Sequence, residues 1–275
     1  MLDKRAHIYN DLAFWEKSKS IYPIHKRLLP FYHKNKRCTD VNDALLVEFD
    51  ADESHRVLDV GCGVGNTLLQ FAVKLNIRGY GISISANEAA LAREHSKNLG
   101  VDHLVTFQRQ SFDEPIAFNY QKAIAIESLK HSFDIEHTAA NLFQSANTDA
   151  LVFVIDDFFV GHDEFDRLSI TLKKDWNLRK LYSREDFVSA FRRAGFEEVG
   201  TIDFTQSVLP KSTVVLQLKI ALFSLLQKIH PNSTKKNLLA IFKSGFILEL
   251  LFQRGLFTYE CLVFRKPAVS NNHLS

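Results

Sequence analysis

Val-Leu-Asp-Val-Gly-Cys-Gly-Val-Gly-Asn, residues 57–66, is the stretch that decides the fold of this chain. The apolar run around Asp59 predicts a buried strand, and glycines follow it at alternate positions, Gly61, Gly63 and Gly65. A helical pattern begins at once, with one apolar face formed by Leu68, Phe71, Ala72 and Leu75. A strand, a glycine turn and a helix N-terminus are typical of a nucleotide-cofactor site. The bare turn lets a ligand lie against the backbone, and the helix offers unpaired N–H groups.

The spacing of these glycines argues against a nicotinamide dinucleotide. That fingerprint is Gly-x-Gly-x-x-Gly, with an acidic residue about 20 positions further on. Counted from Gly61, its third glycine would stand at position 66, which is Asn. The expected carboxylate is also absent from the end of the next predicted strand, Gly79-Tyr-Gly-Ile-Ser83. A nicotinamide oxidoreductase, a cofactor-binding protein without turnover and a purely structural turn remain as alternatives.

Composition and charge limit the class of protein further. With 275 residues, 46% of them hydrophobic, the chain can form one α/β domain with an appended cap. The net charge of +2 gives no support for a nucleic-acid partner. Three widely spaced cysteines and an N-terminus without the apolar core of a signal peptide predict a cytoplasmic protein.

Strand and helix patterns alternate through the middle of the chain, which favours a doubly wound, mainly parallel sheet. After the first strand, further strands are expected at 77–82, 103–108, 122–126, 150–155 and 196–202. Helices are expected from Ser85, which has capping-box spacing to Glu88, from about Glu136 and from Ser183.

Two segments lie outside this alternation: the N-terminal segment, and a stretch with two apolar helical patterns split by His230-Pro-Asn-Ser-Thr. Neither pattern reaches the roughly 20 apolar residues that span a bilayer. We expect the amphipathic pair to cap the substrate, with weak contact to a membrane surface as an alternative. The expected parts are an N-terminal helical segment or lid (1–50), the core (51–212), the helical cap (213–254), the last core strand (255–267) and a tail (268–275).

The pattern Asp59-x-Gly-x-Gly-x-Gly65 resembles the first motif of class I S-adenosylmethionine-dependent methyltransferases. Three more stretches resemble the tocopherol, sterol and cyclopropane-fatty-acid group of that class: Gly81-Ile-Ser-Ile-Ser85, Ala125-Ile-Glu-Ser-Leu-Lys-His131 and 255–267. The resemblance covers roughly residues 55–267. It implies a Rossmann-like, seven-stranded sheet with S-adenosylmethionine as cofactor. The first forty residues lack the Trp-Gly-x-His-x-His type of segment of that group, which leaves the substrate open.

The resemblance also assigns cofactor contacts. It gives Asp59 the amino-acid end of the cofactor and places Ser83 at the ribose hydroxyls, where most relatives have an acid. Gln110 could offer its carbonyl oxygen to the adenine amino group, although a solvated loop residue is an equal alternative. The expected cofactor-binding residues are Asp59, Gly61, Cys62, Gly63, Gly65, Ser83, Ile84, Gln110, Ser111, Phe112 and Glu127.

Glu127 and His131 are the candidate catalytic residues. They follow the fourth strand, at the carboxyl edge where open α/β sheets bind ligands. If the segment is helical, their spacing of four puts both side chains on one face. The donor already carries a sulfonium charge, so the protein must position the reactants, exclude water and deprotonate the acceptor. A histidine that only packs is the alternative for His131. No metal site is expected, since the acidic and histidine spacing matches no zinc motif.

The aromatic content bears on the acceptor. Several of the 23 phenylalanines lie near the expected site, namely Phe112, Phe133, Phe158, Phe159 and Phe165. Aromatic faces stabilise a carbocation, which methylation of an alkene carbon generates. The predicted acceptor is a hydrophobic small molecule, with carbon methylation of an isoprenoid or sterol-like compound first and nitrogen methylation of an alkaloid or amine second. A set of basic residues could bind a diphosphate head or simply face solvent: Lys26, Arg27, Arg179, Lys180 and Arg184.

Overall fold

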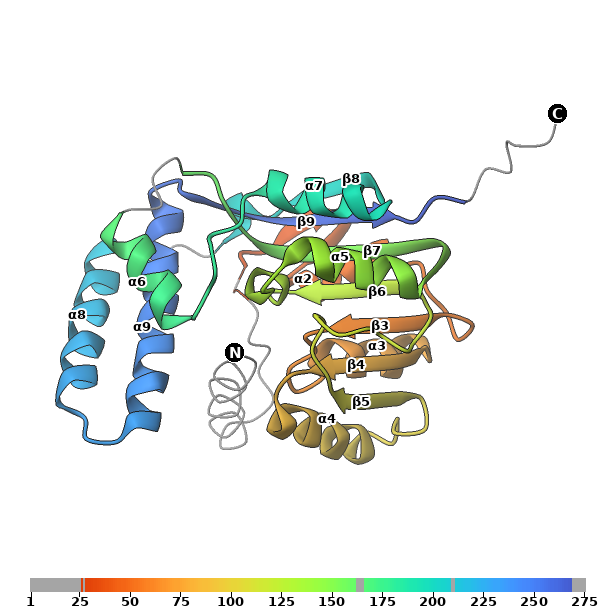
Figure 1. Cartoon of the computed structure of the whole chain (residues 1–275), viewed down its shortest axis with the longest axis horizontal. Coiled ribbons are helices and arrows are strands. Elements are labelled where there is room, and N and C mark those ends of the chain that lie inside the picture. Colours follow the sequence, from red (N-terminus) through yellow and green to blue (C-terminus); the bar gives the residue numbers. More distant parts are fainter. Residues whose placement is uncertain (1–25, 27, 162–165, 209–210, 269–275) are drawn as a thin grey trace.

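The computed structural model describes residues 26, 28–161, 166–208 and 211–268, and a seven-stranded sheet forms its centre (Figure 1). In chain order the strands are β3 (Arg56–Val60), β4 (Arg78–Ser83), β5 (Val105–Arg109), β6 (Tyr120–Ile126), β7 (Ala146–Phe159), β8 (Glu197–Asp203) and β9 (Phe257–Arg265). Their order in the sheet is β5-β4-β3-β6-β7-β9-β8, and β9 runs antiparallel to β7 and β8. The predicted doubly wound, mainly parallel sheet is confirmed.

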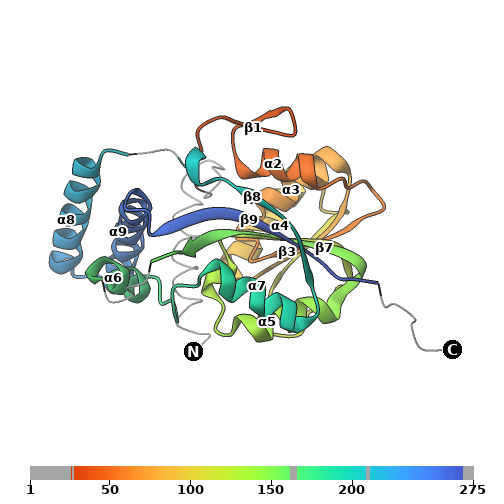
Figure 2. The same cartoon turned by 90° about the horizontal axis from the view of Figure 1, so that it is seen from above.

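Helices cover both faces of this sheet (Figure 2). On one face lie α5 (Ile135–Ser145) and α7 (Arg184–Ala194), and on the other α2 (Val41–Glu48), α3 (Asn66–Leu75) and α4 (Ala86–Asn98). The apolar face read from the sequence of α3 is buried, since Leu68 and Phe71 have no exposed surface. Burial of such stripes against the strands forms the core.

The helix starts expected from the sequence are confirmed by capping contacts. The Ser85 side chain accepts the Glu88 N–H at the start of α4. At the start of α7, Ser183 and Asp186 form a reciprocal capping box, and Gly195 ends that helix with a φ of 108°. These contacts satisfy N–H groups that a helix end leaves unpaired.

The N-terminal segment differs from the helical expectation. In its described part, β1 (Phe31–His33) and β2 (Lys36–Cys38) form an antiparallel hairpin before α2 begins. The two turn residues, Lys34 and Asn35, have φ values of 45° and 62°. Two consecutive left-handed residues make the tight turn that matches strand twist, so a hairpin forms here rather than a helix. Residues 1–25 and 27 lie outside the described part.

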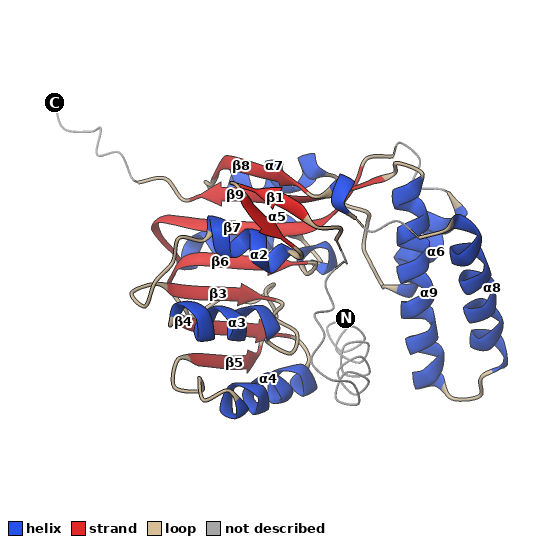
Figure 3. Cartoon of the chain, turned by 180° about the vertical axis from the view of Figure 1, so that it is seen from behind, coloured by secondary structure: helices blue, strands red, loops and turns tan. Residues whose placement is uncertain are grey.

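Three further helices form a layer beside the sheet, at the end where β7 finishes and β9 begins (Figures 1 and 3). Two of them, α8 (Thr213–Ile229) and α9 (Ser233–Gln253), are the helices predicted on either side of His230. The third, α6 (Arg167–Asp175), was not predicted, although the Asp166 side chain caps its first turn. Within the described residues, no helix combines the length and apolarity needed to cross a bilayer.

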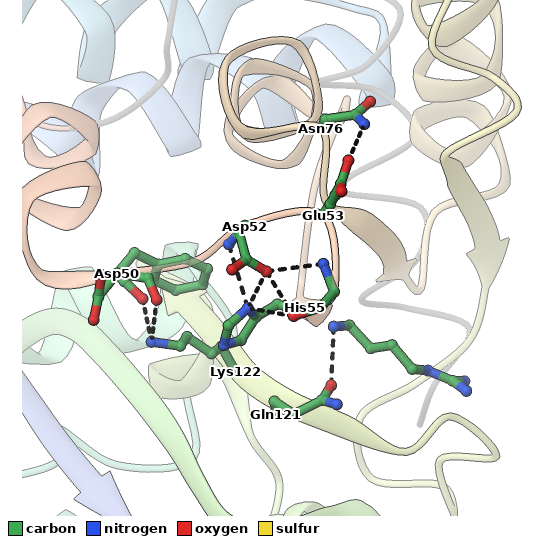
Figure 4. A network of polar contacts seen from close by, with 10 residues as sticks. Asp50, Asp52, Glu53, His55, Asn76, Gln121 and Lys122 are labelled. Carbon is green, nitrogen blue, oxygen red and sulfur yellow. Dashed lines mark hydrogen bonds and ion pairs between the residues drawn. The ribbon is translucent and has the colours of Figure 1, made fainter.

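A polar network lies at the amino ends of β3 and β6, at the end of the sheet opposite to the helical layer (Figure 4). The Lys122 ammonium donates to the backbone carbonyl oxygens of Phe49 and Asp50. Hydrogen bonds from Ser54 lower the pKa of the Asp52 carboxyl to about 2. These contacts tie the loop between α2 and β3 to β6, so we interpret this edge as structural.

Candidate active site

The glycine turn after β3 folds back against the end of β4. The backbone N–H groups of Gly61 and Cys62 both donate to the Ile82 carbonyl oxygen, at 2.9 Å and 2.9 Å. A Cβ added at Gly61 would lie 2.5 Å from the Cβ of Ser128, whereas one added at Gly63 would meet nothing within 4 Å. Gly61 therefore permits close approach to the segment after β6, while the backbone at Gly63 faces open space that a ligand can occupy.

The remaining residues of this turn start α3. Gly65 is the N-cap of the helix, with a φ of 84° and no side-chain cap, and its N–H donates to the Cys62 carbonyl oxygen at 2.9 Å. The Cys62 thiol donates to the Gly63 carbonyl oxygen at 3.5 Å, and burial raises the pKa of that thiol. Cys62 is therefore a protonated, structural residue of the turn rather than a nucleophile.

Asp59 lies at the carboxyl end of β3 and is 4% exposed. Burial raises the pKa of its carboxyl to about 7, although the Leu68 backbone N–H acts in the opposite direction. A carboxylate that is costly to ionise in a buried site gains most from a positively charged ligand. Asp59 therefore suits a cationic group placed against the glycine turn.

We expect Asp59→Asn to flatten the pH dependence of folding stability. The folded-state pKa of Asp59, about 7, lies above the ordinary value of 3.8, so between these pH values the folded state keeps a proton that the unfolded state has lost. The wild-type free energy of unfolding therefore falls as pH rises through this window and levels off above it. The fall due to Asp59 should reach a few kcal/mol, at about 1.4 kcal/mol per pKa unit. Urea unfolding of the wild type and of Asp59→Asn at pH 5 and pH 8 measures this fall. If both proteins lose the same free energy of unfolding between the two pH values, the raised pKa of Asp59 is contradicted.

Beside the turn, Ser83 ends β4 and contacts an acid that sequence reasoning missed. The Ser83 hydroxyl donates to the Glu88 carboxylate at 2.5 Å and accepts the Ser85 N–H at 3.1 Å. Ser83 and Glu88 are both buried, at 4% and 6% exposure. The first turn of α4 thus brings a carboxylate to a strand end that lacks one of its own. The signal that could have identified Glu88 as a site residue is its capping-box spacing from Ser85, because this spacing puts Glu88 in the first turn of the helix that follows β4.

The segment after β5 lies against Ser83, as its backbone shows: the Gln110 N–H donates to the Ser83 carbonyl oxygen at 2.9 Å. The Gln110 side chain accepts the Tyr80 hydroxyl at 3.4 Å and donates to the Pro115 carbonyl oxygen at 2.8 Å. This bridge favours the structural interpretation of Gln110.

The next two residues of that segment, and Ile84 after β4, also have structural contacts. The Ser111 hydroxyl accepts the Asp113 N–H at 3.1 Å, and Phe112 packs in the core. The Ile84 carbonyl oxygen accepts from the Arg109 guanidinium at 3.4 Å. Cofactor contacts of these three residues stay predictions.

Glu127 directly follows β6 and has a left-handed backbone, with a φ of 51°. Its N–H donates to the Ile155 carbonyl oxygen at 2.7 Å. Its carboxylate accepts the Tyr259 hydroxyl and the Lys26 backbone N–H, both at 2.9 Å. A non-glycine residue in this conformation costs about 1 kcal/mol or more and is concentrated at functional sites. Two donors from distant parts of the chain hold the strained residue in one position.

The condition under which Glu127 and His131 would share a helical face is not met. The left-handed Glu127 precedes a short 3₁₀ helix, Leu129–His131, so no α-helix connects the two residues. The His131 ring lies 6.2 Å from the Trp176 ring, centroid to centroid, while the Glu127 carboxylate contacts Tyr259 on β9. The two side chains therefore contact different parts of the structure, and a catalytic role of either stays a prediction.

A buried ionic cluster lies beyond Glu127. Strand β7 extends past the expected 150–155 to Phe159, because β9 pairs with it as far as Phe159, so Asp156 and Asp157 lie within the strand. The Lys130 ammonium contacts both carboxylates, at 3.1 Å and 2.6 Å, and the Lys26 ammonium lies 2.8 Å from Asp157. Burial raises the pKa of Asp157, but these two ammonium groups outweigh it and hold the pKa low. Within the described residues, no three histidine, cysteine or acidic side chains are arranged to hold a metal ion.

We expect Asp157→Asn to lower the free energy of unfolding by about 3–5 kcal/mol, because it removes the carboxylate that pairs with Lys26 and one of the two that face the buried Lys130 ammonium. The control is Glu136→Gln, which breaks an ion pair with Arg193 whose side chains are 58% and 61% exposed. That loss should stay below about 1 kcal/mol. Urea unfolding of the two variants makes the comparison, and losses of equal size would contradict a buried network.

Next to this cluster, between the sheet and the helical layer, is a small pocket of about 10 Å³, room for about one water molecule. Its lining is mostly apolar and aromatic: Lys130, Asp157, Leu172, Trp176, Leu178, Lys180, Leu181, Tyr182, Leu248 and Phe257. The Lys130 ammonium lies 5.3 Å from the Trp176 ring, and the Lys180 ammonium lies 5.2 Å from the Tyr182 ring. These two rings therefore already face ammonium groups of the protein.

The four described phenylalanines expected at the site do not line this pocket. Phe112 and Phe158 are buried in the main core, and Phe159 packs in the core of the helical layer. Phe133 is 42% exposed and lies under the Arg179 guanidinium. Phe165 lies outside the described residues. Trp176 and Tyr182 of the pocket follow α6, which was not predicted, and Phe257 begins β9, so no local pattern links the three rings.

The basic residues considered for a diphosphate head have other partners. Lys26 pairs with Asp157, Lys180 with Asp186 at 2.7 Å, and Arg184 with Glu198. The Arg179 guanidinium donates to the Phe133 carbonyl oxygen at 2.6 Å. Arg27 lies outside the described residues. These contacts favour structural and surface roles for the four described residues.

With this geometry established, the chain can be placed among known proteins. Residues 31–200 match the family model described as a methyltransferase domain. Because this match spans more than half of the chain, the protein belongs to the methyltransferase domain family. The predicted class is confirmed: class I methyltransferases, which use S-adenosylmethionine as methyl donor.

Individual relatives differ in their acceptor atom. The chain is 27% identical to norajmaline N-methyltransferase of Rauvolfia serpentina, covering 56% of this chain and 56% of that protein. It is 22% identical to a probable chloroplastic tocopherol O-methyltransferase of Oryza sativa subsp. japonica, covering 86% of this chain and 68% of that protein. The chain spans only 48–60% of the length of the first curated relatives that it matches.

Solved structures share the fold. Geranyl diphosphate C-methyltransferase from Streptomyces coelicolor A3(2), in complex with Mg²⁺, geranyl diphosphate and S-adenosyl-L-homocysteine, superposes with a TM-score of 0.68 at 14% identity. The superposition covers 96% of this chain and 97% of the other. At this identity the likeness shows the fold alone.

Proposed function

We propose that this chain transfers a methyl group from S-adenosylmethionine to a hydrophobic small molecule, first of all to a carbon of an isoprenoid-type acceptor. The observation that carries the proposal is the open space at the Gly63 backbone beside buried Asp59. That space lies at the same sheet edge as the Glu127 carboxylate.

Residues of the strand ends fit the cofactor. Asp59, whose pKa burial raises to about 7, would pair with its positively charged end. The backbone of Gly61 and Gly63 would lie against it, and the Ser83–Glu88 pair would face its ribose hydroxyls. When bound, S-adenosylmethionine supplies a methyl group on a sulfonium, so no further activation of the leaving group is required.

Glu127 would act as the base. An alkene carbon that gains a methyl group becomes a cation, and loss of a neighbouring proton restores the double bond. The Glu127 carboxylate would take that proton. The Tyr259 hydroxyl and Lys26 N–H fix its position.

The residues that line the pocket bear on the class of acceptor. Both lysines that line it already pair with carboxylates, so they give no support for a diphosphate head. Leu248 of α9 contributes to the lining, which supports the interpretation of residues 213–254 as a substrate cap.

Nitrogen methylation of an alkaloid or amine is the second candidate, favoured by the relative that is named as an N-methyltransferase. An amine acceptor would need a base only to remove its proton, which Glu127 could also do.

The two candidates are distinguished by product analysis. The purified protein is incubated with methyl-deuterated donor and two panels, short isoprenoid alkenes and alkaloid amines, and products are analysed by mass spectrometry and NMR. A new carbon–methyl bond on an isoprenoid supports the first candidate, and labelled amines alone support the second. If no product carries the label while the protein binds S-adenosylhomocysteine, the proposed acceptor classes are wrong.

A further inference from the structure

Helix α8 carries an apolar stripe on its solvent side. Its large apolar side chains are between 43% and 67% exposed: Val214, Val215, Leu218, Leu222, Leu225 and Ile229. Scattered single exposures are ordinary, but a continuous row along one helix marks an interaction surface. We call these six residues the α8 stripe.

The opposite face of α8 is already in contact with the protein. Leu216 is completely buried, and the Phe223 ring lies 5.4 Å from the Phe246 ring of α9, centroid to centroid. The views in Figures 1 and 2 show α8 on the outer side of α9, away from the sheet. The α8 stripe therefore points away from the rest of the described structure.

The charge around the stripe has one sign. Residues 213–236 contain no Asp or Glu, and their charged residues are Lys219, Lys228, Lys235 and Lys236. Lys228 and Lys235, at the turn between α8 and α9, are exposed. An apolar row with lysines beside it and no acid suits an anionic lipid surface, which attracts cations and accepts apolar side chains.

A second copy of the chain fits this surface less well. The stripe alternates steps of three and four residues from Val215 to Ile229, as in a coiled coil. In such a pair the flanking positions would be Lys219 and Lys228, with no acid in the same helix to oppose them. Like charges at these positions oppose pairing, whereas an anionic surface would gain from the exposed Lys228 and Lys235.

We propose that the α8 stripe docks this protein on bilayers that contain anionic phospholipid. The 17-residue helix, about 25 Å long, lies in the plane of the interface with the stripe inserted and the lysines near the headgroups. The proposal is independent of the acceptor and of the methyl transfer.

Vesicle flotation tests the proposal directly. The wild-type protein is expected to float with phosphatidylcholine vesicles that contain phosphatidylserine, and to bind pure phosphatidylcholine at least about tenfold more weakly. Binding to the anionic vesicles should fall as salt rises. The doubly substituted Leu222→Asp/Leu225→Asp and Lys228→Glu/Lys235→Glu proteins should each bind at least about tenfold more weakly than wild type.

The matched control is Val73→Asp/Val199→Asp. It introduces the same charges at two apolar residues outside α8, which are 56% and 45% exposed. It should bind vesicles like wild type. Circular dichroism checks that every variant is folded. Absence of vesicle binding by the wild type overturns the proposal, as does unchanged binding of the leucine variant. A wild-type dimer in sedimentation that the leucine variant abolishes, without vesicle binding, would show that a second copy covers the stripe.

Discussion

Gly63→Val is expected to abolish detectable binding of S-adenosylhomocysteine, a loss of at least about 100-fold in affinity, while the protein stays folded. Gly63 has a φ of 52°, and a Cβ there meets nothing of the protein within 4 Å. The valine side chain would therefore fill the space that the cofactor is proposed to occupy, without striking the core. The unfavourable backbone should cost only about 1–3 kcal/mol of stability. Isothermal titration calorimetry measures the affinity, and urea unfolding measures the stability.

Gly100→Val is the control for this substitution. Gly100 has a φ of 70° and also has nothing within 4 Å of an added Cβ, but it follows α4, at the opposite end of the helix from Glu88. The two variants should lose similar stability, and only the Gly63 variant should lose binding. If both bind S-adenosylhomocysteine like the wild type, the cofactor does not lie against the glycine turn.

Glu127→Gln should slow methyl transfer by about 10²- to 10⁴-fold and leave the affinity for S-adenosylhomocysteine within a few-fold of the wild type. Glutamine keeps the shape of the side chain and a carbonyl oxygen that can accept the Tyr259 hydroxyl and the Lys26 N–H. It cannot take up a proton as a carboxylate does, so only the chemical step suffers. Single-turnover kinetics with the acceptor found by product analysis, together with calorimetry, separate the two effects.

Tyr259→Phe separates the base from the residue that positions it. The variant keeps the ring of a fully buried residue and removes one of the two described donors to Glu127. Its rate should fall less than that of Glu127→Gln. Full activity of Glu127→Gln would remove Glu127 as the base, and equal losses in both variants would show that Tyr259 itself takes part in the reaction.

The parts of the fold that the sequence predicts are those with local signals. Residues 57–66 place a strand, a turn and a helix within ten positions, and the capping serines Ser85 and Ser183 mark helix starts by contacts within three residues. The glycine turn belongs to this set. Its close contact with Ser128 needs the full fold, but its lack of side chains is visible in the sequence alone.

The contacts that complete the candidate site join distant parts of the chain and leave no local pattern. Tyr259 lies 132 positions from Glu127, and Lys26 lies 101 positions from it. The pocket brings Trp176 and Tyr182, which follow α6, together with Phe257 at the start of β9. The turn of the β1–β2 hairpin needs a left-handed backbone at both Lys34 and Asn35. Lysine rarely adopts this conformation. In each case tertiary structure decides what local sequence leaves open.

The most direct test of the central claim is a crystal structure of the protein with S-adenosylhomocysteine. We predict that the amino-acid end of the ligand lies beside Asp59 and against the backbone of Gly61 and Gly63, with the ribose facing Ser83 and Glu88. A ligand bound elsewhere, or a glycine turn that stays free of ligand in crystals whose soaking solution saturates the protein, would contradict the account.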